Sequence, residues 1–301
     1  MKPLLRMAWM NVLLSYRVRI AFFFTFVFPM IFFFIYFSLF AQGQPHAVEA
    51  LMGPLISFSV ISNALFGLSA QLVAMRERDM LRRYHLAPIS AAQMVCSRLL
   101  SNYLLFLPLV VLQYVLAVWW YHMPVHGSLW GLWLIFTLGY LALGSIGLVV
   151  AGIVDNMQEV TVWNNLLFFG LLFLTGTTLP LMQLPHFIQR LALFLPPTLM
   201  ILASAGIMLG GQGIWQNLPE LIGLALITVS ALGLGIALFR WEKEEKTTRR
   251  ARLRAALALI PVLAVGIWLN TSPSFQKANQ AYLDASGAAF NAAAKQATGR
   301  K

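Results

Sequence analysis

The chain has 301 residues, of which 59% are hydrophobic and only 10% are charged, and its mean hydropathy is +0.76. Soluble domains carry roughly 25% charged residues, and a soluble fold of this length cannot bury so much apolar surface in one core. The apolar residues form long blocks without alternation, which argues against a porin-type barrel, and Cys96 is the single cysteine, which excludes a disulfide-rich secreted module. The composition predicts an all-α polytopic membrane protein.

Six apolar stretches are long enough to cross a membrane, because a spanning helix needs about 20 residues. They cover roughly residues 20–41, 51–75, 99–120, 130–154, 161–180 and 218–240. A shorter stretch at 255–270 contains Pro261 and is a candidate seventh helix, and a polar, alanine-rich tail follows it to residue 301. Residues 1–19 carry apolar side chains at helical spacing together with four basic residues, which predicts an amphipathic helix lying in the membrane interface.

The net charge of +11 is concentrated in three basic clusters, at Lys2–Arg19, Arg76–Arg98 and Arg240–Arg254. The connections 42–50 and 121–129 contain no Lys or Arg. The positive-inside rule therefore predicts six helices with both chain ends cytoplasmic, and a nucleic-acid surface explains the charge less well. If 255–270 also spans, the tail lies outside, an arrangement that its four basic residues mildly oppose.

Signatures of catalysis and of metal binding are missing from the sequence. It contains no G-x-x-x-x-G-K-[ST] phosphate-binding loop, no G-x-S-x-G, no H-E-x-x-H and no C-x-x-C. His122 and His126 are spaced like a helical metal pair, but Pro124 separates them and no further ligand is near in sequence. No acidic residue falls in the middle of an expected span, which argues against a proton-coupled pump. We expect no catalytic or metal site in this chain.

The most informative local segment is RERDMLRRYHLAPIS at 76–90. It predicts a charged amphipathic helix of about three turns that ends at Pro88, with Ser90 as the cap of the next helix. Leu81 and Tyr84 share one face of this helix, and Arg78 and Arg83 lie largely elsewhere. From periodicity alone, a docking surface for a soluble partner and a solvated positive loop both remain open.

This segment resembles the first cytoplasmic segment of ABC-2 type transporter permeases, whose pattern is roughly R-E-x-G-T-L-x-R-L-x-x-x-P-L-S. The matching positions are Arg76, Glu77, Leu81, Arg83, Pro88 and Ser90, and the departure is Asp79-Met80 in place of Gly-Thr. Residues 174–198 are similar to the family's extracellular stretch rich in Gly, Pro and Thr. Its matching positions are Gly176, Pro180, Leu184, Pro185, Pro196 and Thr198. The resemblance covers most of 1–254.

The resemblance implies a six-helix ABC-2 transmembrane domain at 20–254, of the type V exporter kind, in a bacterial inner membrane. The chain would be the permease subunit of an exporter and would pair with a second permease copy or a homologue. Two copies of a separate ATPase would bind beneath and would carry the ATP, the Mg and the catalytic residues. Residues 76–88 would be the coupling helix. The implied ATPase-coupling residues are Arg76, Glu77, Arg78, Asp79, Leu81, Arg83, Tyr84, Pro88, Asp155 and Glu159.

Residues 181–197 are too short and too rich in proline to cross a membrane, yet they are apolar. We expect a re-entrant segment that closes the outer end of a pathway, with a simple external loop on the headgroups as the alternative. The outer gate residues would be Gly176, Pro180, Leu184, Pro185 and Pro196. The loop 155–159 is a cytoplasmic connection without basic residues, and its acids are expected to face a docking partner or the basic residues of 76–83.

Polar residues within the spans are few. An apolar pathway with a few amides and hydroxyls suits an amphiphilic cargo such as a drug, lipid or glycoconjugate. The candidate pathway residues are Asn63, Asn102, Asn164, Asn165 and Thr175. Small residues, among them Gly144, Gly147 and Gly152 of the fourth span and Gly223, Gly233 and Gly235 of the sixth, predict close helix packing, within the chain in preference to a dimer seam.

Two functions of other classes compete with a permease. A non-transporting scaffold or sensor would use the 76–88 helix to recruit another soluble partner. A membrane-embedded enzyme would need catalytic groups gathered at one depth, and the sequence supplies no such cluster. Copurification of a nucleotide-binding partner would favour the permease over both.

Overall fold

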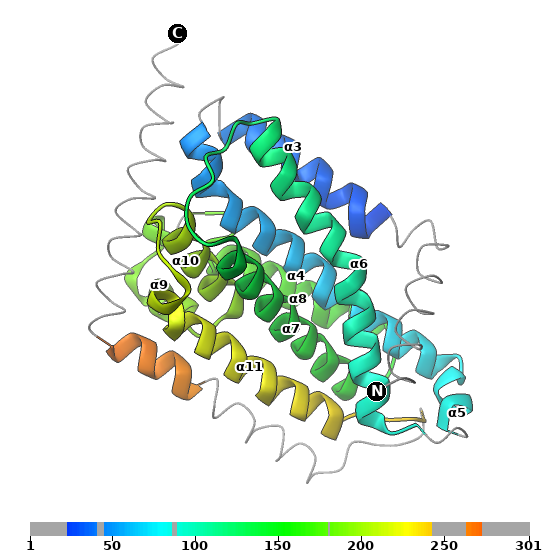
Figure 1. Ribbon diagram of the computed structural model, residues 1–301. Helices are drawn as coiled ribbons and strands as arrows, with labels where there is room; N and C mark the ends of the chain where they lie inside the picture. The colour runs from blue at the N-terminus through cyan, green and yellow to red at the C-terminus, as the bar shows by residue number, and fades with distance from the viewer. Residues whose placement is uncertain (1–22, 41–44, 86–88, 180, 243–262, 273–301) are drawn as a thin grey trace.

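Figure 1 shows the computed structural model of the chain, which describes residues 23–40, 45–85, 89–179, 181–242 and 263–272. The described residues form helices, turns and irregular connections, with no β-strand among them. The all-α fold class expected from the sequence is therefore confirmed. The expected amphipathic helix 1–19 lies outside the described residues.

The helices follow one another in chain order. They are the π-helical turn Phe23–Val27, α3 (Phe28–Phe40), α4 (Pro45–Glu77), α5 (Met80–His85), α6 (Ala91–Trp119), α7 (Leu129–Ile153), α8 (Met157–Leu174), the 3-10 turn Leu181–Gln183, α9 (His186–Ala192), α10 (Pro196–Met208), the 3-10 turn Ile214–Asn217 and α11 (Leu218–Ala237). A further helix covers residues 263–271.

Five of the described helices are long and apolar enough to cross a membrane, and a bent pair counted as one span would make six. The five belong to α4, α6, α7, α8 and α11. The first expected span, 20–41, is described from Phe23 onward and contains a shorter apolar helix at Thr25–Leu39. The chain is a multi-pass membrane protein.

Local capping explains where two spans begin earlier than expected. α6 starts at Ala91 because the Ser90 hydroxyl accepts from Gln93 N at 3.2 Å, and the Gln93 side chain accepts from Ser90 N at 3.0 Å. This capping box confirms the predicted role of Ser90. α8 starts at Met157 because Asn156 Oδ1 accepts from Glu159 N at 2.8 Å.

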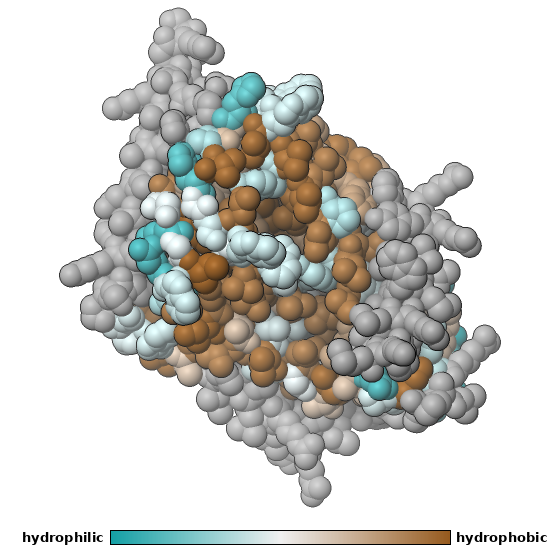
Figure 2. All heavy atoms as spheres, in the orientation of Figure 1, coloured by the Kyte–Doolittle hydropathy of each residue, from teal (hydrophilic) through white to brown (hydrophobic). Residues whose placement is uncertain are grey.

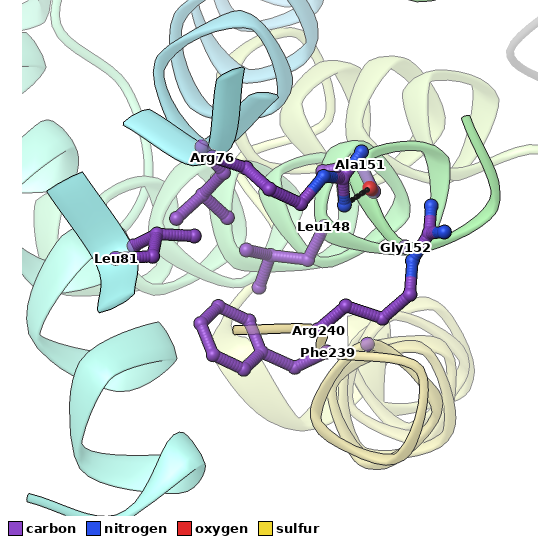
Figure 3. A pocket seen from close by; sticks show the side chains of 9 residues that line it. Arg76, Leu81, Leu148, Ala151, Gly152, Phe239 and Arg240 are labelled. Carbon is purple, nitrogen blue, oxygen red and sulfur yellow. Dashed lines mark hydrogen bonds between the residues drawn. The ribbon is translucent and has the colours of Figure 1, made fainter. Parts of the chain in front are cut away.

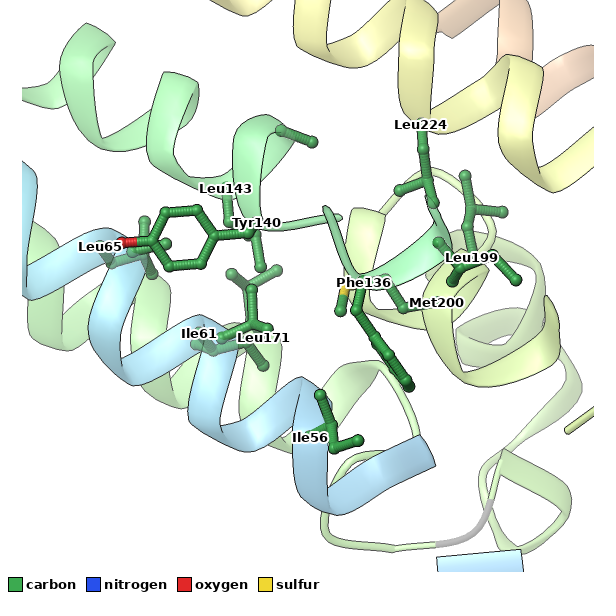
Figure 4. Packing of buried hydrophobic residues seen from close by; sticks show 14 of the residues in the cluster. Ile56, Ile61, Leu65, Phe136, Tyr140, Leu143, Leu171, Leu199, Met200 and Leu224 are labelled. Carbon is green, nitrogen blue, oxygen red and sulfur yellow. The ribbon is translucent and has the colours of Figure 1, made fainter. Parts of the chain in front are cut away.

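The core of the bundle is built around α4 and α7. In their most apolar stretches 72% and 67% of the residues are buried, against 33% in α6 and 17% in α8. Figure 4 shows Ile61 and Leu65 of α4 close to Tyr140 of α7, with Leu171 of α8 beside them. α4 and α7 are therefore central, whereas α6 and α8 present most of their surface outward.

Glycine lets α7 approach its neighbours closely. A Cβ on Gly235 of α11 would lie 2.9 Å from Leu148 Cβ, and one on Gly152 would lie 2.7 Å from Leu238 Cβ. A Cβ on Gly147 would lie 3.1 Å from the carbonyl oxygen of Ala64 in α4. The prediction that these glycines pack helices within the chain is confirmed for all three.

The visible outer surface of the bundle is largely apolar (Figure 2). The exposed side chains include Val111 and Val115 of α6 and Leu166 and Phe169 of α8. Tryptophans Trp119, Trp120, Trp130 and Trp215 lie exposed near the ends of α6, α7 and α11, where aromatic residues mark a membrane–water boundary.

Candidate functional site

The helix expected at 76–88 is interrupted. α4 continues through Arg76 to Glu77, and Asp79 N donates to Arg76 O at 3.1 Å in the turn that closes it. Asp79 adopts a φ of 54°, in the left-handed region that aspartate tolerates better than most residues. α5 then starts at Met80 and has only six residues. The prediction of a single helix of about three turns was wrong, because the chain turns at Asp79.

α5 is held to the bundle by one apolar side chain. Leu81 is 1% exposed and packs with Met75 of α4 and Met94 of α6 in a small cluster edged by Tyr84 and other apolar residues. Pro88 and the side chain of Arg83 lie outside the described parts. On the other side of this anchor, Arg78 and Met80 are exposed, and so is 71% of the Arg82 side chain.

Arg76 lies inside the bundle, not on the α5 surface. The residue is 4% exposed; Nη1 donates to the carbonyl oxygen of Ala151 at 2.9 Å, and Nη2 donates to that of Val154. Figure 3 shows Arg76 reaching across to Ala151. Cations stabilise a helix C-terminus because the last carbonyls lack partners within the helix. The expectation that Arg76 contacts an ATPase is corrected: it fastens α4 to the end of α7.

Arg240, just after α11, reaches the same loop. Its Nη2 donates to Val154 O at 2.6 Å and its Nη1 pairs with Asp155 Oδ1 at 2.7 Å. We call this cluster, formed by Arg76, Val154, Asp155 and Arg240, the arginine joint. It ties α4, the α7–α8 loop and the end of α11 together beside a small pocket. The pocket is lined by Leu72, Arg76, Leu81, Leu148, Ala151, Gly152, Gly235, Phe239 and Arg240 (Figure 3).

The acids near this loop also have partners within the chain. Glu77 Oε1 accepts from Met157 N at 2.7 Å, which links the end of α4 to the start of α8. Glu159 Oε2 accepts from Asp155 N at 2.9 Å. The Asp155 side chain is 68% exposed even with Arg240 as its partner. The expected pairing of these acids with the basic residues of 76–83 is replaced by the Arg240 pair and by backbone contacts.

Most of the candidate pathway residues form hydrogen bonds within the chain. Asn164 Nδ2 donates to Ser69 Oγ at 2.7 Å between α8 and α4, and Asn102 exchanges hydrogen bonds of 3.2 Å with Gln71 between α6 and α4. Asn63 Nδ2 donates to Thr25 O at 3.3 Å, and Thr175 Oγ1 donates to Leu171 O at 2.6 Å. Asn165 alone of the five is exposed. The structure thus gives four of the five a partner within the chain.

The segment expected to be re-entrant is longer than 181–197. α9 and α10 are bent by 92° at their junction, a geometry of a broken span or a re-entrant loop, and α10 runs buried to Met208. Pro185 precedes the first residue of α9, and Pro196 starts α10 because proline suits a first helical turn. Leu184 O accepts from Gln189 Nε2 at 2.8 Å. Pro180 lies outside the described residues.

A turn precedes this hairpin. Gly176 has a φ of +85°, and a Cβ there would lie 2.7 Å from Leu181 Cγ, so the turn requires glycine. Thr198 Oγ1 lies 3.4 Å from Thr175 O and links the start of α10 to the end of α8.

We call the end of the bundle with the arginine joint the arginine end, and the end with α9 the hairpin end.

At the hairpin end one histidine of the candidate metal pair has a carboxylate partner. His126 Nδ1 lies 3.0 Å from Glu49 Oε1, whose side chain is 3% exposed. The pair connects the α6–α7 loop to the first turns of α4. Within the described residues, no group of three or more His, Cys, Asp or Glu side chains is arranged to hold a metal ion.

Comparison with known families identifies the protein family of this chain. The model of the ABC-2 type transporter family matches residues 3–209. The chain belongs to the ABC-2 type transporter family. Comparisons with curated proteins and with solved structures found no match. ABC-2 permeases are transmembrane components of ABC transporters that generally work with an ATPase subunit and are not themselves the ATPase.

In this ABC-2 permease, the residue that sequence reasoning missed is Arg240. It lies beyond residue 209, where the family match ends, and it looked like one cation among seven in the cluster Arg240–Arg254. A usable signal was its position directly after an apolar span, in reach of a short loop that carries Asp155. Only the packing of α11 against α7 brings the two side chains together.

Proposed function

We propose that this chain is the permease subunit of an ABC exporter and that a separate ATPase docks on the exposed face of α5. The observation that carries the proposal is the two-sided character of α5. Leu81 fixes the helix to α4 and α6, while Met80 and Arg82 of α5 and Arg78 of the preceding turn are exposed. A small anchored helix with exposed arginine side chains can both bind a partner and pass a displacement to the bundle.

The proposed coupling route starts at this face. ATP-driven closure of the ATPases would move α5 as a rigid body, because interfaces between packed elements switch between discrete arrangements. Leu81 would transmit the movement to the ends of α4 and α6, and the arginine joint would carry it to the α7–α8 loop and α11. ATP and Mg would bind to the ATPase, and the hydrolytic residues would lie there.

The remaining features of the proposal concern assembly and cargo. A second permease copy or a homologue would complete the pathway, with two ATPases beneath it. The arginine end would face the cytoplasm of a bacterial cell, because the described basic residues Arg76, Arg78, Arg82 and Arg240 lie at that end. The apolar outward faces of α6 and α8 suit an amphiphilic cargo that enters from the lipid.

The test is purification of the tagged chain from its native membrane, with mass spectrometry of the proteins that accompany it. We expect a stoichiometric partner with a G-x-x-x-x-G-K-[ST] sequence. Arg78→Glu combined with Arg82→Glu should lower its yield while membrane insertion is retained. Arg190→Glu, an exposed arginine of α9 at the hairpin end, is the matched control and should leave the yield unchanged.

Two outcomes would contradict the proposal. Normal ATPase yield and normal transport in the Arg78/Arg82 double variant would remove α5 as the docking surface. Recovery of a different soluble partner, with no ATPase even after cross-linking, would favour the scaffold or sensor. Glu77 is a poorer test residue than the sequence suggested, because its contact with Met157 N makes any loss ambiguous.

A further inference from the structure

Helix 263–271 packs against the hairpin end of the bundle. Gly266 lies so close to the ring of Phe194, in the connection between α9 and α10, that a Cβ at position 266 would overlap it. A Cβ on Gly223 of α11 would lie 3.1 Å from Val265 Cγ1 and 3.9 Å from Leu269 Cδ1. Val265 and Leu269 are both buried. The helix therefore belongs to the folded bundle.

Asn270 extends this contact to α9. Its Nδ2 donates to Arg190 O at 3.2 Å and to Gly266 O at 2.8 Å. Arg190 stands in the last turn of α9, where backbone carbonyls lack partners within their own helix. Asn270 is thus a positioning residue for the hairpin, contributed by a segment outside the region that the family model matches.

The direction of α11 gives the depth of these contacts. α11 has 20 residues, and a helix of that length covers about 30 Å. It starts beside α10 at Leu218 and ends near Arg240, which belongs to the arginine joint. Gly223 stands in its second turn, so the contact lies about 8 Å from the hairpin end. Figure 1 shows helix 263–271, in orange, beside α11 and far from α5.

We infer that the chain crosses the membrane once more after α11. Arg240 lies at the arginine end and helix 263–271 at the hairpin end, so the chain between them must pass from one face to the other. The 20 residues 243–262 suffice, because even a helix of that length reaches about 30 Å. Ser272 then lies at the hairpin face. Only the identification of that face as the outer one depends on the proposed function.

The crossing has two consequences. The two ends of the chain lie on opposite faces, if the first span crosses as the sequence predicts. The seventh segment also braces the α9–α10 hairpin through Gly266 and Asn270.

The test is cysteine accessibility in sealed cells, with a membrane-impermeant maleimide applied before and after permeabilisation. Cys96→Ser removes the single native cysteine. Single cysteines are then introduced as Arg78→Cys and Glu242→Cys at the arginine end, and as His122→Cys and Ser272→Cys at the hairpin end. We expect Ser272→Cys to label like His122→Cys, from the face opposite to Arg78→Cys and Glu242→Cys.

Labelling of Ser272→Cys together with Arg78→Cys and Glu242→Cys would overturn the inference. If the pairs label as expected but Arg78→Cys and Glu242→Cys react from outside, the inference stands and the orientation in the proposed function fails. If the Cys96→Ser protein does not accumulate, the labelling assay is replaced by a fusion of alkaline phosphatase after Lys301 of the full chain. We expect high phosphatase activity, because this enzyme is active only outside the cytoplasm. Low activity, together with evidence that the arginine end is cytoplasmic, would overturn the inference.

Discussion

At the scale of single residues, position on a helix decides what a charge does. Arg76 and Arg78 are two residues apart in the same motif, yet Arg76 is buried against α7 and Arg78 is exposed. α4 continues through Arg76, so the helical period directs that side chain to the end of α7. The turn at Arg78–Asp79 then directs the next cation outward.

Replacement of Arg76 tests this division of roles. Arg76→Met removes the donors to Ala151 O and Val154 O, and hydrogen bonds from a charged group contribute about 1.5–3 kcal/mol each. We expect a clear loss of thermal stability in detergent, whereas Arg78→Met, its exposed control, should change the free energy of unfolding by no more than about 0.5 kcal/mol. Equal effects of both substitutions would contradict the buried role of Arg76.

Two glycines of α11 provide a second comparison. Gly235→Val places carbon atoms against Leu148, and overpacking of a well-packed core costs about 1–3 kcal/mol. Gly233→Val, two residues away, meets no atom within 4 Å and makes the same change in helix propensity. Thermal unfolding in detergent should show a loss for the first variant only. A loss of equal size in both would mean that the contact with α7 is not limiting.

At the scale of elements, α8 has one face that packs against the bundle and a larger face that points outward. Only 17% of the residues in its apolar stretch are buried, and Asn164 is among them. The reciprocal contact between Asn164 and Ser69 attaches α8 to the central helix α4. Its neighbour Asn165 faces outward. Adjacent amides that look equivalent in the sequence therefore have different environments.

This difference predicts unequal effects of the same substitution. Asn164→Leu leaves Ser69 without its interhelical partner and should cost about 1 kcal/mol of stability, typical of hydrogen bonds between membrane helices. Asn165→Leu should leave stability unchanged. The measurement is the unfolding midpoint of each purified variant. Destabilisation by Asn165→Leu alone would reverse the assignment of packing and outward residues.

At the scale of the whole molecule, most of the charged side chains among the described residues lie near the arginine end. The net charge is +11, and the exposed cations Arg78 and Arg82 lie on the proposed docking face. Arg82 lies 3.7 Å from Glu242, but an ion pair this exposed contributes little. The face therefore offers a partner the exposed guanidinium groups of Arg78 and Arg82, with the exposed acids Glu77 and Asp79 beside Arg78.

Binding of the ATPase should accordingly depend on salt. The Debye length falls from about 8 Å at physiological ionic strength to about 3 Å at 1 M, which screens an exposed charged interface. We expect the yield of the complex to fall as salt rises during purification, with a weaker dependence in the Arg78→Glu, Arg82→Glu variant. A yield that is independent of salt in the unaltered chain would indicate an apolar interface centred on Met80.

The sequence by itself determined the features that depend on local composition. Apolar length predicted the long spans, Ser90 was recognised as a helix cap, and the motif at 76–90 pointed to the family. These features require only a membrane thickness, a helical period and hydrogen bonds within one turn, so they can be read from neighbouring residues.

Only the tertiary structure decided which polar groups meet. In the arginine joint, Val154 O accepts from Arg76, which is 78 positions away in the sequence, and from Arg240, which is 86 positions away. Asn270 donates to Arg190 O across a separation of 80 positions. Such partners depend on which helices pack together and at what depth. The residues next to each partner in the sequence do not encode that packing. For the same reason, only the structure shows that Asn102 and Asn164 bond to α4 and that Arg76 is buried.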